Sequence, residues 1–306
     1  MINILASQSY NYLKKNLLKT KKFHNLDIES KTFPDGEHYL RIQNPKQISG
    51  KPAVYICGTT DDAAILEAYN IACTLVQEGC QSLHLVIPYF GYSTMERAVI
   101  SGEIVSAKNI ARLFSSIPLS AVGNYIYLVD LHSIGTQYYF EQNIHSVHLT
   151  TDSIIDKMIN DIRRSRKNVV LASADMGRAK WIEKISSRLN MSSGFIMKKR
   201  VSGVETEVIA LNADVKNKDV ILFDDMIRSG SSIIHATEAY KSIGAKDIYV
   251  VCVHGVFTDG AIDRLQKSGI IKAIYCTNTH AKTQLIQDKF VKVYDVSDII
   301  LEGLKV

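Results

Sequence analysis

The sequence has little of what marks several classes of protein. It contains only five prolines and no low-complexity stretch or long linker, which fits a compact chain. Its five cysteines are an odd number without a C-x-x-C pair, and most have apolar neighbours, so we interpret them as buried thiols. No stretch reaches the roughly 20 apolar residues of a membrane helix, and the apolar run at the N-terminus is too short for a secretory signal. We therefore expect a cytoplasmic protein.

The composition is that of a globular protein of ordinary size. The chain has 306 residues, of which 46% are hydrophobic and 22% charged, enough for two domains that each have a core. The formal net charge of +5 is mild and is not gathered into one basic run. It fits an anionic small substrate as well as a weak nucleic-acid partner, so charge alone does not decide between them.

Short β-branched runs alternate with amphipathic helical stretches along the whole chain. This alternation predicts an α/β fold, with mainly parallel sheets that are covered by helices. The predicted strands are residues 53–57, 83–88, 125–129, 169–172, 220–223 and 248–253.

A faint internal repeat indicates two similar domains. Residues 67–88 and 237–253 share the order helix, glycine, apolar strand, and each follows a strand that ends in two aspartates. We predict an N-terminal domain of residues 1–148 and a C-terminal domain of residues 149–306, whose last helix could pack back on the first domain. A ligand is expected at the strand ends between them. Any α/β protein can show such echoes, so the repeat alone leaves duplication open.

Residues 220–232, VILFDDMIRSGSS, have the layout of a phosphate-binding loop. An apolar strand is followed by a turn of small residues and then by a helix that starts near residue 233. Backbone N–H groups and hydroxyls in the turn can bind a phosphate beside the helix amino terminus, and a glycine lets the backbone approach closely. The turn consists of Ser229, Gly230, Ser231 and Ser232.

Two carboxylates precede this turn. Asp224 and Asp225, predicted just beyond the strand, can accept hydrogen bonds from the two hydroxyls of a ribose whose 5-phosphate sits in the loop. Aspartate also caps helices, but capping explains two adjacent carboxylates poorly. The segment resembles the phosphoribosyl-binding motif of type I phosphoribosyltransferases and of ribose-phosphate pyrophosphokinases, and it leaves both families open. Arg228 departs from the pyrophosphokinase pattern, which has an aspartate there.

Segments of the first domain favour the pyrophosphokinases. The turn FPDGE at residues 33–37 is similar to the family segment that reaches the adenine of ATP from a neighbouring subunit. VIPYFGY at residues 86–92 and VSAK at residues 105–108 are similar to a family strand, loop and helix, and VDLHS at residues 129–133 matches a strand-end histidine. The resemblance implies ATP-binding roles for Phe33, Asp35, Glu37, Arg97 and His132.

Two segments of the second domain extend the resemblance. SADMGRAK at residues 173–180 is similar to the family segment that binds pyrophosphate oxygens and metal, which implies that Asp175 binds ribose 5-phosphate and metal. The basic trio at residues 198–200 falls after a predicted strand, where the family has a mobile loop. Lys198 and Arg200 then align with the two catalytic cations.

The resemblance runs from about residue 3 to about residue 304. It implies the phosphoribosyltransferase type I fold for both domains and a diphosphokinase that moves the pyrophosphoryl group of ATP to the 1-hydroxyl of ribose 5-phosphate. It also implies Mg²⁺ as cofactor, held by His132 and Asp175. The implied partners are ATP and ribose 5-phosphate, with neither nucleic acid nor membrane, in a homo-oligomer (dimer or hexamer) that shares its adenine site between subunits.

Because the sequence departs from the family pattern at several positions, two alternative functions stay open. Thr94 and Met95 stand where the family has an arginine and a glutamine that touch the nucleotide. Together with Arg228, they favour a non-catalytic regulatory relative, whereas His132, Asp175 and the two catalytic cations argue against it. A phosphoribosyltransferase is the third alternative, but no segment suggests a nucleobase pocket.

Overall fold

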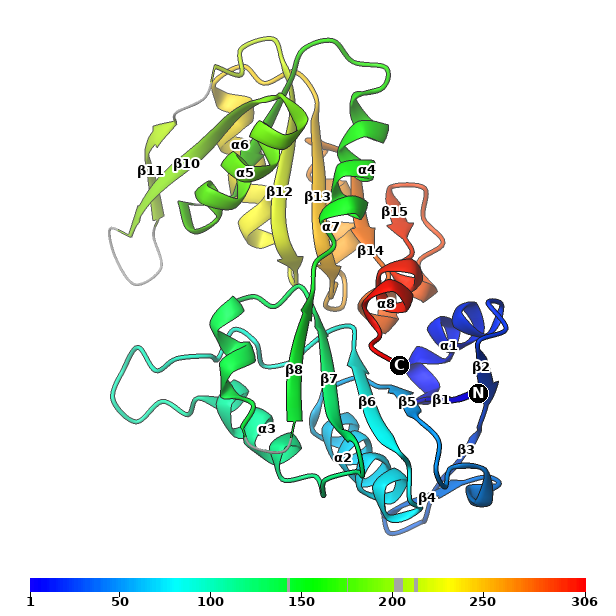
Figure 1. Ribbon diagram of the computed structural model, residues 1–306. Helices are drawn as coiled ribbons and strands as arrows, with labels where there is room; N and C mark the ends of the chain where they lie inside the picture. The colour runs from blue at the N-terminus through cyan, green and yellow to red at the C-terminus, as the bar shows by residue number, and fades with distance from the viewer. Residues whose placement is uncertain (142–143, 175, 201–205, 212–213) are drawn as a thin grey trace. The chain divides into compact units, whose positions relative to one another are not determined.

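The computed structural model describes residues 1–141, 144–174, 176–200, 206–211 and 214–306, and for residues 176, 196–200 and 206–211 it describes the backbone alone. The chain divides into two compact units. The first consists of Met1–Thr150 together with Ser297–Val306, and the second consists of Thr151–Val296. Each unit is built around one sheet (Figure 1).

The first unit contains a six-stranded sheet with the order β2-β1-β5-β6-β7-β8, in which all neighbours are parallel. The strands are β1 (Ile2–Ala6), β2 (Phe23–Asn25), β5 (Ala53–Ile56), β6 (Ser82–Ile87), β7 (Gly123–Val129) and β8 (Ile144–Leu149). The helices are α1 (Asn11–Leu18), α2 (Asp62–Gln77), α3 (Ser106–Ser115) and α8 (Ser297–Gly303), with 3₁₀ turns η1 (Gln8–Tyr10), η2 (Pro45–Gln47) and η3 (Ile134–Tyr139).

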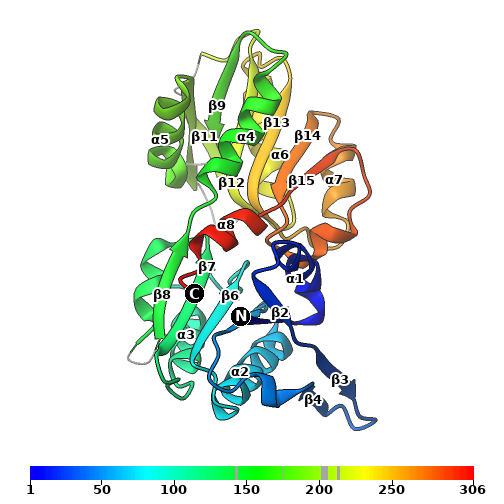
Figure 2. The same ribbon diagram turned by 45° about the vertical axis from the view of Figure 1, so that its right-hand side comes forward.

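An antiparallel hairpin, β3 (Ile28–Thr32) and β4 (His38–Ile42), extends from the first unit (Figure 2). Leu5, Tyr55 and Leu85 from the sheet pack with Ala68 and Phe114 from α2 and α3 in one buried cluster. Such burial of alternate strand residues against a helix is what the apolar pattern predicts.

The last helix belongs to the first unit, where α8 contacts α1 and β8. A Cβ on Gly303 would lie 2.4 Å from a methyl carbon of Leu149, so a larger residue would have to displace that side chain. Lys305 N–H then donates to the Tyr127 hydroxyl at 3.1 Å. These contacts fasten the end of the chain to the sheet of the first unit.

The second unit contains a seven-stranded sheet with the order β11-β10-β9-β12-β13-β14-β15, which is parallel except for the pair β10 and β11. The strands are β9 (Val169–Ser173), β10 (Ser192–Arg200), β11 (Thr206–Leu211), β12 (Asp219–Ile227), β13 (Ile248–Gly255), β14 (Ile271–Thr277) and β15 (Val291–Tyr294). The helices are α4 (Asp152–Arg163), α5 (Ala179–Leu189), α6 (Ser231–Ser242) and α7 (Ala261–Lys267), with 3₁₀ turns η4 (Met176–Arg178) and η5 (Ala281–Leu285).

Alternation along β12 supplies two buried clusters, one on each face of this sheet. Val220 and Leu222 pack with Ile233 and Tyr240 of α6, whereas Ile221 and Phe223 pack among residues of α4 and α5. The predicted α/β fold with two parallel sheets flanked by helices is confirmed.

Each sheet has one point at which the connections leave in opposite directions. In the first unit β1 leads through α1 to β2 on one side, while its neighbour β5 leads through α2 to β6 on the other. In the second unit β9 and β12 have the same relation. Ligands of parallel sheets bind outside the carboxyl ends of the strands at such switch points.

All five cysteines are free thiols, and Cys57, Cys80, Cys252 and Cys276 are buried. Burial raises the pKa of Cys80 to about 12, which makes it a poor nucleophile or metal ligand. Within the described ranges, no helix is both long and apolar enough to cross a membrane.

Candidate active site

The loop after β12 forms an open cradle at the amino end of α6. Gly230 is the residue that precedes the helix, with a φ of 82°, and no side chain caps the helix there. Its Cβ would lie 2.8 Å from Leu265, so a larger residue would have to displace that side chain. Ser229 and Ser231 bring their hydroxyl oxygens to 3.2 Å, and Ser231 N–H donates to Ser229 Oγ at 3.4 Å. Ser232 is exposed beside them.

The chemistry of this cradle suits an anion. The first turn of α6 contains no acidic residue, so the partial positive charge of the helix end is not neutralised by its own chain. The hydroxyl groups of Ser229 and Ser231 and the N–H group of Ser231 belong to exposed residues of this loop. These are the features of helix-end phosphate sites in general.

Two arginines flank the cradle, and sequence reasoning missed one of them. Arg264 on α7 donates from Nη2 to the Ser229 carbonyl oxygen at 3.1 Å. Arg228 is exposed, and its carbonyl oxygen accepts from Thr258 N–H at 3.1 Å. Both cations add positive potential near the loop. Arg264 lies 35 residues from Ser229 in the sequence, so no local pattern could have found it.

The two carboxylates differ from the prediction in their position. They lie inside β12, which pairs with β13 as far as Ile227, rather than just beyond the strand. Successive strand residues point to opposite faces, so Asp224 lies on the face of α6 and Asp225 on the face of α4 and α5. Asp224 Oδ1 accepts from Asp225 N–H at 2.9 Å. The sequence did not reveal this extension because the added pairing is with a distant strand.

Asp225 is held by an arginine to which sequence reasoning assigned no role. Arg178 Nη2 lies 2.6 Å from Asp225 Oδ2, and the side chains are 21% and 12% exposed. Arg178 ends η4 and lies three residues after Asp175, in the same SADMGRAK segment. Asp175 itself lies outside the described residues, so its predicted binding of ribose and metal stays a prediction.

The basic trio is part of a strand. Lys198, Lys199 and Arg200 end β10 and pair with Val208, Glu207 and Thr206 of β11 in an antiparallel ladder. The expectation of a loop at these three residues was wrong, because a partner strand follows directly and satisfies their backbone groups. The structure describes only the backbone of these three residues. The catalytic roles of Lys198 and Arg200 therefore stay predictions.

The FPDGE segment forms the tip of the β3–β4 hairpin. Phe33 N–H donates to the Glu37 carbonyl oxygen at 2.8 Å, Gly36 N–H donates to the Phe33 carbonyl oxygen at 2.9 Å, and Gly36 has a φ of 94°. Glu37 N–H also donates to Asp35 Oδ1 at 3.1 Å. Phe33 is 46% exposed and meets the Tyr39 ring edge-on with centroids 6.1 Å apart. The tip therefore leaves an aromatic ring and two carboxylates exposed.

The predicted histidine follows the end of β7. Asp130 has a φ of 37°, and His132 is half-buried two residues later. Leu131 N–H donates to His148 Nε2 at 3.2 Å, and that nitrogen lies 4.0 Å from Asp130 Oδ1. An imidazole and a carboxylate thus stand at the carboxyl end of this strand. The side chain of Arg97 is 77% exposed, with Nε 3.7 Å from Glu96 Oε1.

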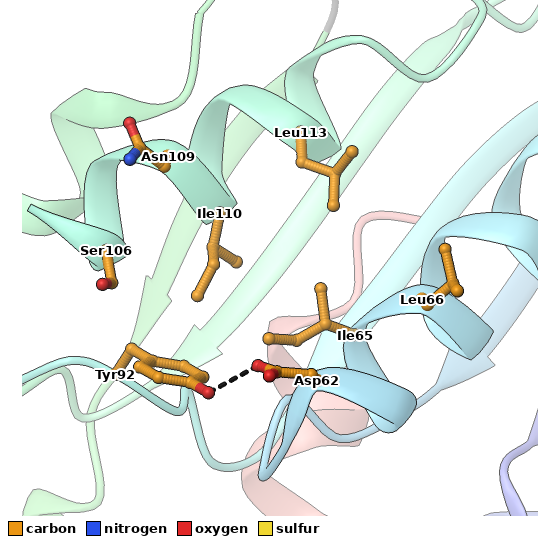
Figure 3. A pocket seen from close by; sticks show the side chains of 8 residues that line it. All are labelled: Asp62, Ile65, Leu66, Tyr92, Ser106, Asn109, Ile110 and Leu113. Carbon is orange, nitrogen blue, oxygen red and sulfur yellow. Dashed lines mark hydrogen bonds between the residues drawn. The ribbon is translucent and has the colours of Figure 1, made fainter. Parts of the chain in front are cut away.

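Also in the first unit, α2 and α3 line an open pocket of about 440 Å³ (Figure 3). Ile65 and Ile110 face each other across it, and Tyr92 lies at one end. The Tyr92 hydroxyl donates to Asp62 Oδ1 at 2.5 Å, although Tyr92 has an unfavourable φ of 58°. A Cβ on Gly91 would lie 1.8 Å from the Thr59 carbonyl oxygen, so close packing fixes the backbone before Tyr92.

A larger cavity of about 910 Å³ lies at the switch point between β1 and β5. Glu37, Asp61, Asp62 and Glu67 line it, and the described lining includes no lysine or arginine. Burial raises the pKa of Glu67, partly offset by the Tyr55 hydroxyl at 3.4 Å. This lining is unsuited to an anion.

No three histidine, cysteine, aspartate or glutamate side chains among the described residues gather closely enough to hold a metal ion. Mg²⁺ is usually bound by one or two carboxylates together with waters and substrate phosphates. The donors Asp130 and His132 after β7 are compatible with that chemistry. The predicted ligand pair His132 and Asp175 stays a prediction.

The sheets, their switch points and the serine-glycine cradle define a two-unit α/β protein of the kind that binds phosphorylated ligands. Comparison with known proteins identifies the family. A family model for the N-terminal domain of ribose phosphate pyrophosphokinase matches residues 2–117, and a model for the phosphoribosyl synthetase-associated domain matches residues 184–306. The chain belongs to the ribose-phosphate pyrophosphokinase family, and the resemblance noted from the sequence is confirmed.

Relatives and a solved structure agree with this placement. The ribose-phosphate pyrophosphokinase of Thermococcus kodakarensis is 31% identical, and that of Pyrococcus furiosus is 30% identical; each alignment covers 83% of this chain and 86% of the relative. That of Saccharolobus solfataricus is 29% identical over 98% of this chain and 99% of the relative. The crystal structure of phosphoribosylpyrophosphate synthetase from Mycobacterium smegmatis shares the fold, with a TM-score of 0.85 at 22% identity, covering 98% and 96% of the two chains.

Proposed function

We propose that this chain is an active ribose-phosphate diphosphokinase that works in the cytoplasm. In this reaction the 1-hydroxyl oxygen of ribose 5-phosphate attacks the β-phosphorus of ATP. The bond from that phosphorus to the oxygen bridging to the α-phosphate breaks, and AMP leaves. The observation that carries the proposal is the relationship to enzymes of that name at 30–31% identity over 83% of the chain.

The cradle after β12 supports the acceptor half of this reaction. In the proposal, the dianionic 5-phosphate binds to the hydroxyl and N–H donors of Ser229, Gly230, Ser231 and Ser232, where the end of α6 favours negative charge. Asp224 and Asp225 then accept hydrogen bonds from the ribose hydroxyls. Arg228 and Arg264 strengthen the attraction for the phosphate.

The transferring group needs cations rather than covalent chemistry. Phosphoryl transfer depends mainly on alignment and on neutralising charge at the equatorial oxygens and the leaving group. We assign that neutralisation to Lys198 and Arg200. Mg²⁺, when held by His132 and Asp175, would supply further positive charge at the phosphate oxygens.

The donor half uses the first unit. We assign Arg97 and His132 to ATP within one subunit, and Phe33, Asp35 and Glu37 to the adenine of a neighbouring subunit in a homo-oligomer. The exposed ring of Phe33 at the hairpin tip supports this assignment, since a flat base can stack on it. Thr94 and Met95 leave the preference for adenine over other bases to be measured.

The test is release of AMP from ATP and Mg²⁺ by the purified chain, with and without ribose 5-phosphate, and with Lys198→Ala as control. The proposal requires AMP that appears only with ribose 5-phosphate and falls strongly in the control. No AMP under any donor or phosphate condition would favour a non-catalytic regulatory relative instead. Consumption of phosphoribosyl pyrophosphate with a nucleobase would favour a phosphoribosyltransferase.

A further inference from the structure

An ion pair joins the segment after β9 to strand β12 in the second unit. Arg178 Nη2 and Asp225 Oδ2 are 2.6 Å apart, within the range of a strong charge-assisted hydrogen bond. The side chains retain 21% and 12% of their exposure, so the pair is shielded but still reachable by a ligand. A guanidinium has five N–H donors, so it can bind a carboxylate and a further oxygen atom at the same time.

Packing beneath the pair fixes its position. Trp181, one helical turn after Arg178, stacks on Phe223 with centroids 3.7 Å apart and an angle of 19° between the rings. Phe223 and Asp225 are two residues apart in β12 and therefore share the face toward α5. The ring stack and the ion pair are thus successive contacts between the start of α5 and β12. Both hold the end of η4 against the strand.

The pair also lies where a ligand of this sheet is expected. β9 and β12 are neighbours whose connections leave in opposite directions, through α5 to β10 and through α6 to β13. The pair therefore spans the switch point itself, and the Ser229 cradle follows the same strand a few residues later. The pair and the cradle thus belong to the carboxyl-terminal part of β12 and the loop that follows it.

We propose that Arg178 and Asp225 together bind the two neighbouring (vicinal) hydroxyls of ribose. This makes Arg178 a specificity-determining residue. This rests on the proposed function of the site. The carboxylate accepts a hydrogen bond from one hydroxyl, and a guanidinium N–H donates to the oxygen of its neighbour. A sugar without the 2-hydroxyl loses one of these two hydrogen bonds. The site then rejects 2-deoxyribose 5-phosphate in favour of ribose 5-phosphate.

The experiment measures affinities of both sugar phosphates by calorimetry on the full chain, without nucleotide. One hydrogen bond to a charged group corresponds to a preference of about 10- to 100-fold for ribose 5-phosphate in the wild type. Arg178→Met removes the charge at similar size, and the preference should fall to within about threefold. Arg178→Lys keeps the charge and should keep part of the preference.

A matched control exists on the same helix. Arg188 of α5 also forms an ion pair at 2.6 Å, with Asp156 of α4, but far from the carboxyl edge of the sheet. Arg188→Met should leave the preference unchanged, even if it lowers the melting temperature. A structural role of Arg178 would alter stability alone, whereas a specificity role alters the ratio of the two affinities.

The outcomes separate this inference from the proposed function. Equal affinity of the wild type for the two sugar phosphates would overturn the assignment of Arg178 without any variant having to fold. So would an Arg178→Met chain that binds ribose 5-phosphate and retains the full preference. Absence of binding of either sugar phosphate to the wild type would contradict the proposed function as well.

Discussion

Both units have the same kind of switch point, but the helix that begins there has acidic residues at its amino terminus in the first unit and none in the second. After β5, Asp61 caps α2 by accepting from Ala64 N–H at 2.9 Å, and Asp62 adds a second carboxylate to the first turn. After β12, Gly230 precedes α6 without a side-chain cap, and the first turn has no acid. The first helix end is neutralised by its own chain, whereas the second is left for an anion.

This difference teaches that topology alone does not make a phosphate site. Each sheet directs a loop and a helix amino terminus to the switch point. The one or two residues that begin the helix then decide whether the end binds a ligand or serves stability. The carboxylate-lined cavity of about 910 Å³ in the first unit and the serine-glycine cradle of the second are the two results.

The largest effect should come from the cations assigned to the second unit. Lys198→Ala should reduce AMP formation about 100- to 1000-fold while the fold persists, by analogy with loss of a donor to a developing negative charge. Steady-state kinetics and circular dichroism check both parts. A near-normal rate would contradict the assignment of the chemistry to this unit.

Low pH should lower the stability of both units, and one substitution should reveal the contribution of the first unit. Burial lowers the pKa of His84 in the first unit to about 4, and burial also lowers that of His280 in the second to about 4. A histidine whose pKa is lower in the folded state contributes stability above about pH 6.5, which is lost as the pH falls toward 4. For His84 the loss is up to about 3 kcal/mol.

The measurement is the free energy of unfolding in urea between pH 7 and pH 4. His84→Gln should flatten the decline of the first unit, because its ring no longer gains a proton on unfolding. His145→Gln, an exposed histidine of the adjoining region of the sheet, is the control. Equal slopes in wild type and His84→Gln would show that other groups dominate.

Placing an aspartate at the start of α6, as at the start of α2, should make the two helix ends alike in charge. Ser231 is the first residue of α6, as Asp62 is of α2. Ser231→Asp should weaken ribose 5-phosphate binding at least about tenfold relative to Ser231→Asn, because the carboxylate repels the phosphate. The same substitution should raise stability by about 0.3–1 kcal/mol through the helix dipole. Unchanged affinity would place the phosphate elsewhere.

The smallest effect should come from the reverse change in the first unit. Asp61→Ala removes the cap of α2 and should cost about 1 kcal/mol of unfolding free energy. Binding of ribose 5-phosphate should not change, since the site lies in the other unit. Urea unfolding together with calorimetry distinguishes this result from a role of the first helix end in binding.

Local patterns predicted much of this architecture. The apolar runs located β5, β6, β7, β9, β12 and β13, and the turn at Gly230 located the start of α6 to within two residues. These features depend on neighbours in the sequence, which alternation and helix-start signals report directly.

Long-range pairing explains what the sequence could not predict. Lys198 and Arg200 belong to a strand because β11 pairs with them, and Asp225 lies in β12 because β13 extends the ladder. The contacts of Arg178 with Asp225 and of Arg264 with Ser229 join residues far apart in the chain. Side chains brought together only by the fold leave no local signal.

The most direct test of the difference between the two helix ends is hydrogen–deuterium exchange of the full chain with and without ribose 5-phosphate. Binding at the cradle should slow exchange of the amides of residues 229–233, where the proposal places the phosphate, and leave those of residues 61–65 unchanged. Protection at residues 61–65, or none at residues 229–233, would contradict the account.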